Sequence, residues 1–217
     1  MASTRRPVLK VILVGDFGVG KSSLFRRFVY DSFVEDNSRG STLGFDHFEK
    51  PFTIEGKEVM LQLWDTGGLE RVASITSSYY KHADAAILVF SYDAFDSFNS
   101  LSNHMLEILE YADNTRIFLC GNKLDLAGYG NGPSDGAVEV FYNEYRLNEG
   151  ENLIRKLYKV SCKTNDGVHR MFEDIAKILG RSCRTEPEPD PDHFRLRRPS
   201  TSSQNNRCCS GNGSGDG

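Results

Sequence analysis

The chain of 217 residues lacks several features that would place it in other classes of protein. No apolar run approaches the roughly 20 residues that a helix needs to cross a bilayer. The first residues, Met-Ala-Ser-Thr-Arg-Arg-Pro, contain no apolar region typical of a secretion signal, and alanine at position 2 does not fit a myristoylation signal. The net charge of −4 gives no general reason to expect nucleic-acid binding. We therefore expect a cytosolic protein without a nucleic-acid partner.

Cysteine is also scarce, with five residues in the chain, and no spacing of cysteine and histidine resembles a zinc site. Cys120 and Cys162 lie next to apolar runs, so we expect both to be reduced core residues. Cys208 and Cys209 differ, because they are adjacent and lie in a polar segment near the end of the sequence.

Apolar runs alternate with amphipathic stretches up to Leu179. Most of the runs are continuously apolar, as expected for strands of a sheet that is covered on both faces. Residues 45–54 instead alternate and contain Pro51, which predicts an edge strand joined by a Glu55-Gly56 turn to the next strand. This order predicts an α/β fold with a mostly parallel sheet. The other predicted strands are 7–14, 58–64, 85–91, 116–120 and 157–160, and the predicted helices are 23–30, 97–111, 136–147 and 165–179, the last with Asn165 as its cap.

The composition changes after Leu179. Residues 186–192 read E-P-E-P-D-P-D, and residues 210–217 contain mainly glycine and serine. Such a segment cannot bury a core. The sequence therefore predicts one domain over residues 1–181 and a disordered tail over residues 182–217.

A phosphate-binding loop follows the first predicted strand. Residues 15–22 read G-D-F-G-V-G-K-S, which fits the pattern G-x-x-x-x-G-K-[ST], with a strand before it and a helix after it. The glycines allow backbone N–H groups to point toward a phosphate, Lys21 supplies a positive charge, and the Ser22 hydroxyl is a ligand for Mg²⁺. This loop alone does not distinguish ATP from GTP.

Further motifs follow later predicted strands or lie in the loops between them. Thr42, in a polar stretch, is a candidate second hydroxyl ligand for Mg²⁺ when a γ-phosphate is present. Asp65 comes directly after an apolar run and suits an outer-shell contact to the same ion, while Gly68 allows a backbone N–H to approach the γ-phosphate. A simple Asp-Thr-Gly turn is the alternative for residues 65–67.

The sequence Asn122-Lys123-Leu124-Asp125 indicates which base is bound. Guanine offers an N1–H and an amino group on one edge, and the Asp125 carboxylate can accept from both, whereas adenine has the opposite pattern. Asn122 would brace the neighbouring loops, Lys123 would lie over the base, and the backbone of Ser161-Cys162-Lys163 would contact the guanine carbonyl. An ATP-dependent kinase or ATPase is therefore disfavoured.

This ordered set of motifs resembles the small GTPases of the Ras superfamily over roughly residues 9–179. Residues 42–44 (T-L-G) and 75–83 (I-T-S-S-Y-Y-K-H-A), with the paired cysteines of the tail, are similar to the Rab branch. The resemblance implies a P-loop NTPase G domain, an α/β fold whose six-stranded, mostly parallel sheet carries five helices on its two faces. It also implies two switch segments, at about residues 33–48 and 65–83, that order around γ-phosphate and Mg²⁺.

The resemblance places GTP or GDP and Mg²⁺ against a defined set of residues. Phe33 matches the aromatic residue that stacks on guanine, although a core position after the first helix is the alternative. The implied metal residues are Ser22, Thr42 and, in the outer shell, Asp65. The implied nucleotide residues are Gly15, Asp16, Phe17, Gly18, Val19, Gly20, Lys21, Ser22, Ser23, Phe33, Thr42, Asp65, Gly68, Asn122, Lys123, Asp125, Ser161, Cys162 and Lys163.

The chain departs from the family at residues that serve hydrolysis rather than binding. The catalytic set comprises Lys21, Gly68 and the position of Leu69, where the family usually has the glutamine that orients the attacking water. Leucine has no polar group for this task. Phe17 replaces a small residue beside the γ-phosphate, and Gly67 replaces an alanine. We expect weak intrinsic hydrolysis and a bias toward GTP; alternatively, a partner supplies the missing groups, or the chain is a GTP-bound scaffold controlled by exchange and abundance.

The resemblance also implies partners and a location. Effectors would contact three aromatic positions, held here by His47, Trp64 and Tyr79, although His47 is equally explained as a solvated edge-strand residue. Cys208 and Cys209 resemble a double geranylgeranyl site, but eight residues follow them and no C-a-a-X motif is present. We expect a monomer in the cytosol and on the cytosolic face of intracellular membranes. The expected partners are an exchange factor, a GTPase-activating protein, effectors, a GDP-dissociation inhibitor and geranylgeranyl transferase.

Overall fold

A computed structural model of the chain describes residues 6–34, 46–65, 76–112, 114–147 and 153–182. The chain divides into two units, residues 1–183 and residues 184–217, and the second unit lies wholly outside the described residues. The predicted division between a domain and a disordered tail therefore stays a prediction. Within the described residues, no helix is both long and apolar enough to cross a membrane.

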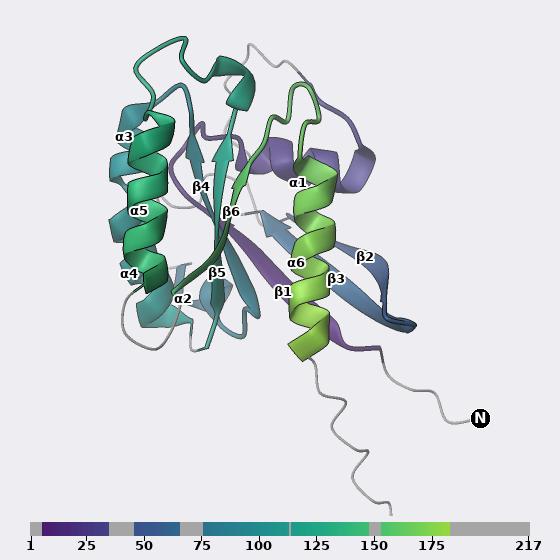
Figure 1. Cartoon of the computed structure of the whole chain (residues 1–217). Coiled ribbons are helices and arrows are strands. Elements are labelled where there is room, and N and C mark those ends of the chain that lie inside the picture. The colour runs from purple at the N-terminus through teal and green to yellow at the C-terminus, as the bar shows by residue number, and fades with distance from the viewer. Residues whose placement is uncertain (1–5, 35–45, 66–75, 113, 148–152, 183–217) are drawn as a thin grey trace, which may run out of the picture. The chain divides into compact units, whose positions relative to one another are not determined.

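A six-stranded sheet forms the centre of the first unit, in the order β2-β3-β1-β4-β5-β6 (Figure 1). β2 pairs antiparallel with β3, and the other neighbours pair in parallel. The predicted mostly parallel sheet is confirmed, as is the edge position of the strand that contains Pro51, which tolerates proline because one side of an edge strand needs no ladder hydrogen bonds. The strands are β1 (Val8–Val14), β2 (Asp46–Ile54), β3 (Lys57–Asp65), β4 (Ala85–Ser91), β5 (Arg116–Asn122) and β6 (Ile154–Lys159).

Helices cover both faces of this sheet. α1 and α6 pack on one face, and α3, α4 and α5 pack on the other, together with the tyrosines of α2. The central strand β4 is buried at all of its positions, which explains why its sequence is continuously apolar rather than alternating. The helices are α1 (Lys21–Tyr30), α2 (Thr76–Tyr80), α3 (Phe95–Asn99), α4 (Leu101–Tyr111), α5 (Asp135–Leu147) and α6 (Val168–Ser182), with a 3₁₀ turn at Leu124–Leu126.

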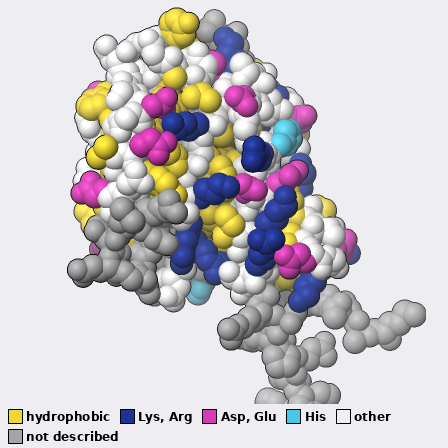
Figure 2. All heavy atoms as spheres, viewed as in Figure 1, with side chains coloured by type: hydrophobic (Ala, Val, Ile, Leu, Met, Phe, Trp, Pro, Cys, Tyr) yellow, Lys and Arg dark blue, Asp and Glu magenta, His cyan; other side chains and the backbone are white. Residues whose placement is uncertain are grey.

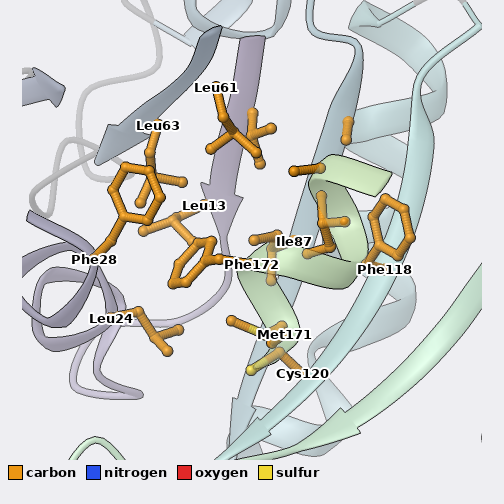
Figure 3. Packing of buried hydrophobic residues seen from close by; sticks show 14 of the residues in the cluster. Leu13, Leu24, Phe28, Leu61, Leu63, Ile87, Phe118, Cys120, Met171 and Phe172 are labelled. Carbon is orange, nitrogen blue, oxygen red and sulfur yellow. The ribbon is translucent and has the colours of Figure 1, made fainter. Parts of the chain in front are cut away.

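The packing of α1 and α6 against the sheet is dominated by aromatic rings. Phe28 of α1 and Phe172 of α6 have ring centroids 4.7 Å apart, and both lie above Leu13 and Leu63 of the sheet (Figure 3). Burying a phenylalanine side chain contributes roughly 1.5–3 kcal/mol. This contact holds the carboxyl-terminal half of α1 against α6.

Charged side chains of both signs are interspersed on the face that carries α5, β6 and α6 (Figure 2). Lys156 of β6 pairs with Asp174 of α6 at 2.6 Å, and Lys159 pairs with Asp135 of α5 at 2.8 Å. These ion pairs connect the last strand to a helix on each face of the sheet. Because they are largely exposed, each contributes at most about 1 kcal/mol.

Some predicted elements were wrong in detail. The helix predicted over residues 97–111 is divided at Ser100 into α3 and α4. The Ser97 hydroxyl of α3 donates to the Ala94 carbonyl and accepts from the Ser91 N–H, and these bonds hold α3 at the end of β4. Asn165 is not the cap of the last helix. It has a φ of 64°, and α6 starts only at Val168. α2 was not among the four helices predicted from periodicity. Together with the division at Ser100, it brings the described residues to six α-helices, one more than the resemblance implied.

Candidate guanine-nucleotide site

The loops that carry the predicted motifs all follow parallel strands. The phosphate loop follows β1, Asp65 ends β3, Asn122 ends β5, and Ser161 comes shortly after β6. Parallel strands end at the same edge of a sheet, so these residues gather at one edge (Figure 1).

The glycines of the phosphate loop are required by its geometry. Gly15, Gly18 and Gly20 have φ values of 144°, 81° and 97°, which other residues rarely adopt. A Cβ atom at Gly15 would lie 2.2 Å from the Val89 carbonyl oxygen, and one at Gly20 would lie 2.3 Å from the amide nitrogen of Asn122. The loop is thereby held close to β4 and β5, and Gly20 accepts the first helical hydrogen bond of α1, from Leu24.

Lys21 places its charge inside this loop. The side chain is buried, and its ammonium donates to the carbonyl oxygens of Gly15 at 2.6 Å and Asp16 at 2.8 Å. Val19 is buried, and Ser22 and Ser23 are half-buried in the first turn of α1. A buried cation, a helix amino terminus and a glycine turn form a donor set that fits a phosphate group.

Phe17 lies at the outer side of the loop rather than in the core. Its side chain is 44% exposed, in the turn immediately before Gly18. The expected effect of this ring on the γ-phosphate edge stays a prediction.

Asn122 connects two loops of the site. Its amide nitrogen donates to the Val19 carbonyl at 2.9 Å, and its amide oxygen accepts from the Cys162 N–H at 3.3 Å. Asn122 is buried, so both bonds are formed away from solvent. The side chain thus fixes the phosphate loop relative to the loop after β6.

Asp125 is held in place by Ser161, whose hydroxyl donates to its carboxylate at 2.5 Å. The same hydroxyl accepts from the Thr164 N–H at 3.1 Å. Asp125 is half-buried, which leaves part of the carboxylate toward solvent where a base could be bound. The arrangement orients a negative acceptor as guanine recognition requires.

Lys123 has a left-handed conformation, with a φ of 58°, and its ammonium is 2.8 Å from the Asp93 carboxylate. Partial burial disfavours ionised Asp93, but hydrogen bonds from Lys123 and the Ser91 hydroxyl outweigh it, so the pKa of Asp93 lies below its usual value. The ion pair holds the Lys123 side chain of the Asn122–Asp125 segment toward Asp93, just after β4. Asp93 was not identified from the sequence.

The two core cysteines are free thiols, as predicted. Burial raises the pKa of Cys162 to about 12, although a hydrogen bond with Asn122 and the charge of Arg27 partly oppose the shift. Burial likewise raises the pKa of Cys120 well above its usual value. Both thiols are therefore neutral, and Cys162 contributes to the site through its backbone.

Arg27 is a second residue that the sequence reasoning missed. From α1, its guanidinium donates to the carbonyls of Cys162 at 2.7 Å and Lys163 at 3.0 Å. It also lies 5.9 Å from the ring centroid of Phe33, which is partly buried against the core. Arg27 thus positions the loop after β6 from the opposite side to Asn122. An arginine in the first helix has no signal of its own until the topology brings these loops together.

The candidate metal residues are only partly described. Asp65 is buried at the end of β3, paired in register with Asp46 of β2. Ser22 lies in the first turn of α1. Thr42, Gly68 and Leu69 lie outside the described residues, as do Cys208 and Cys209.

The proposed effector aromatics do not form a common exposed surface. His47 is exposed and stacks on half-buried Trp64, with ring centroids 4.6 Å apart. Tyr79 is buried, which corrects the expectation that it is an exposed contact residue. Its hydroxyl accepts from the Leu13 N–H and donates to the Trp64 carbonyl, because the ladder between β1 and β3 ends at Ile12 and Trp64 and leaves these groups for a side chain.

Comparison with known proteins identifies the family. Residues 10–181 match the model of the Ras family. The chain is 33% identical to the Ras-related protein RABE1d of Arabidopsis thaliana over 210 residues, which cover 94% of this chain and 93% of the relative. It is 38% identical to the Ras-related protein Rab-30 of Homo sapiens over 178 residues, covering 82% of each, and 36% identical to the Ras-related protein Rab-1D of Dictyostelium discoideum over 190 residues, covering 87% and 88%.

The chain belongs to the Ras family. Within the superfamily it is a Rab-like small GTPase, a class that binds GTP or GDP with Mg²⁺. Its relatives support a GTP-dependent switch in membrane traffic, served in general by exchange factors, activating proteins, effectors and dissociation inhibitors.

Proposed function

We propose that the chain is a monomeric guanine-nucleotide switch with weak intrinsic hydrolysis, which recruits effectors to intracellular membranes in its GTP state. The observation that supports guanine binding best is the hydrogen-bonded frame around Asn122 and Asp125. This frame joins the phosphate loop to the predicted base-binding loops through hydrogen bonds within the chain. Preorganised polar groups raise affinity because less ordering remains to be done on binding.

Weak hydrolysis is supported by two residues that depart from the family pattern. Leu69 has no polar atom with which to orient a water molecule, and Phe17 carries a large ring beside the glycines of the phosphate loop. The polar side chains expected to bind phosphate, Mg²⁺ and guanine, among them Lys21, Ser22 and Asp125, are retained. The GTP state should therefore persist until a partner protein accelerates its hydrolysis.

Single-turnover GTP hydrolysis by the purified chain tests this proposal. We expect Leu69→Gln to accelerate hydrolysis by at least about tenfold, because it restores a donor and acceptor for the water. Phe17→Ser should leave intrinsic hydrolysis nearly unchanged but increase acceleration by an activating protein. Leu106→Gln and Phe95→Ser are matched controls, since Leu106 is an exposed leucine of α4 and Phe95 is 44% exposed, as Phe17 is.

A rate that equals that of an ordinary relative and does not respond to Leu69→Gln would refute weak hydrolysis. The nucleotide content after purification distinguishes a switch from the alternative, a GTP-bound scaffold. A fixed, stoichiometric GTP content that exchange factors do not alter favours a scaffold, whereas a mixture of GDP and GTP that exchanges favours a switch.

Effector binding and membrane attachment need separate tests. The stacked pair of His47 and Trp64 offers a mixed polar and aromatic surface on β2 and β3, so His47→Ala should weaken effector capture by the GTP-loaded chain. For the tail, we propose geranylgeranylation of Cys208 and Cys209, since two lipid chains anchor stably where one does not. Intact mass of the chain from eukaryotic cells, with both cysteines or with serine at both, tests the modification.

A further inference from the structure

His104 of α4 contacts the phosphate loop directly. Its Nε2 atom lies 2.7 Å from the Oδ1 atom of Asp16, across 88 positions of sequence. The histidine side chain is only 14% exposed, and that of Asp16 is 33% exposed. This contact is therefore shielded from solvent more than a surface ion pair, and it connects α4 to the phosphate loop.

The second ring nitrogen of His104 faces another carboxylate. Its Nδ1 atom lies 3.5 Å from Glu107 Oε2, and the same oxygen accepts a hydrogen bond from the Tyr80 hydroxyl at 3.2 Å. Tyr80 is buried and belongs to α2, which packs against α4 and lies within the predicted second switch segment. A chain of polar contacts thus runs from Asp16 through His104 and Glu107 to Tyr80.

The number of N–H groups on the His104 ring determines which of these contacts are hydrogen bonds donated by histidine. Carboxylates only accept hydrogen bonds, and a neutral imidazole carries one N–H. With a carboxylate at each ring nitrogen, only the doubly protonated ring can donate to both Asp16 and Glu107. The charged groups facing the ring are these two carboxylates. The Tyr80 hydroxyl donates to the Glu107 carboxylate, and the Lys21 ammonium donates to the backbone carbonyl of Asp16.

Asp16 is consequently held from two directions. Its carbonyl accepts from Lys21, and its carboxylate contacts His104. The Lys21 bond joins two residues within the loop. The His104 contact joins the loop to α4, on the face of the sheet opposite to α1 and α6. Without His104, one of these two constraints on the loop disappears.

We propose that His104 is a positioning residue that holds the phosphate loop in its nucleotide-binding conformation through Asp16, and links that conformation to α2 through Glu107 and Tyr80. The proposal rests on the guanine-nucleotide site proposed above. His104 does not touch the nucleotide; its effect is on how long the nucleotide stays bound. Loss of a charge-assisted hydrogen bond to the loop should accelerate release of bound GDP by about tenfold.

The test measures release of a fluorescent GDP analogue from the full chain in Mg²⁺ at neutral pH. His104→Leu, which removes both ring nitrogens, should release the analogue about tenfold faster than the unmodified chain. His104→Gln keeps an amide donor and should restore part of the slow release. His169→Gln is the matched control, because His169 makes a 2.9 Å contact with Asp31 at an exposed site outside the phosphate loop.

A double-variant cycle tests the contact itself. Asp16→Asn and His104→Gln should each accelerate release, and the combined variant should be no faster than the faster single variant. A thermal melt with saturating GDP confirms that each variant is folded, and His104→Gln alone suffices if His104→Leu fails to fold.

Unchanged release in His104→Gln with tight GDP binding, or additive effects in the cycle, would overturn the inference while leaving guanine binding intact. Absence of GDP binding by the unmodified chain would instead overturn the proposed function and this inference together.

Discussion

The guanine end and the phosphate end of the candidate site are built in different ways. At the guanine end, Asn122, Asp125, Ser161 and Arg27 are joined to one another's loops by side-chain hydrogen bonds. At the phosphate end, glycine conformation and Lys21 shape the loop, Phe17 is largely exposed, and Thr42, Gly68 and Leu69 lie outside the described residues. The two ends therefore depend on different groups of residues, and Asn122 connects them through its hydrogen bond to Val19.

This difference is consistent with the proposal that residues 17 and 69 alter hydrolysis without loss of nucleotide binding. Neither residue takes part in the hydrogen bonds of Asn122 with Val19 and of Asp125 with Ser161. A change within the guanine end, in contrast, affects several loops at once because one side chain serves two of them. Variants at the guanine end should therefore have the larger effects on affinity.

Asp125→Ala should produce the largest effect and tests whether the guanine end selects the base. The variant loses two charge-assisted hydrogen bonds to guanine, so its affinity for GDP should fall by at least about 100-fold. Calorimetry with GDP and with ADP measures both affinity and selectivity. Asp174→Ala is the control, since Asp174 pairs with Lys156 away from this site; equal losses in both variants would contradict base recognition by Asp125.

Asn122→Ala should rank second, because this residue holds two loops. The variant leaves the Val19 carbonyl and the Cys162 N–H without their partner, which should lower the free energy of unfolding by about 2–4 kcal/mol. GDP release should accelerate in parallel. Urea unfolding of the variant, compared with Asn103→Ala at an exposed position of α4, measures the effect. A loss no greater than that of the control would show that the two ends are not coupled through Asn122.

A pair of glycine variants sharpens the comparison within the phosphate loop. Gly18 and Gly20 both have positive φ, so alanine at either position should cost about 1–2 kcal/mol of conformational strain. Only at Gly20 would the new Cβ collide with Asn122. At Gly18, apart from the glycine and its two chain neighbours, no atom of the described residues lies within 4 Å of an added Cβ. Gly20→Ala should therefore destabilise the chain more than Gly18→Ala in thermal melts. Equal shifts would indicate that the Asn122 amide moves away without penalty.

Sequence reasoning succeeded where a residue's role follows from its own position in the chain. The apolar run 85–91 predicted a buried strand, and the alternating run with Pro51 predicted an edge strand, because burial on one or two faces leaves a direct periodicity. The candidate residues at strand ends were likewise identified, since parallel topology alone gathers them at one edge.

Sequence reasoning failed where a role depends on a partner that is distant in the sequence. Arg27, Asp93 and His104 act through contacts with residues at least 30 positions away, and no local pattern marks such contacts. Tyr79 was expected at the surface because aromatic residues at that position resemble contact residues. Its burial follows from the end of the β1–β3 ladder, which is visible only once the strands are paired.

The smallest expected effect is a pH dependence of stability that arises from Asp93 at the guanine end. At the guanine end, hydrogen bonds from Lys123 and Ser91 overcome the effect of partial burial and lower the pKa of Asp93 in the folded chain. A carboxyl whose pKa is lowered by folding contributes stability above its unfolded pKa, and this contribution is lost as the pH falls through the folded pKa. The stability difference between the unmodified chain and Asp93→Asn should therefore be constant near neutral pH and shrink below about pH 4.

The loss in Asp93→Asn should be small at neutral pH. The expected change in unfolding free energy is no more than about 1 kcal/mol, because the ion pair with Lys123 is partly exposed. Urea unfolding of the two proteins near neutral pH and below about pH 4 measures the difference. A difference that persists in acid would show that the charge of the Asp93 carboxylate does not stabilise the fold.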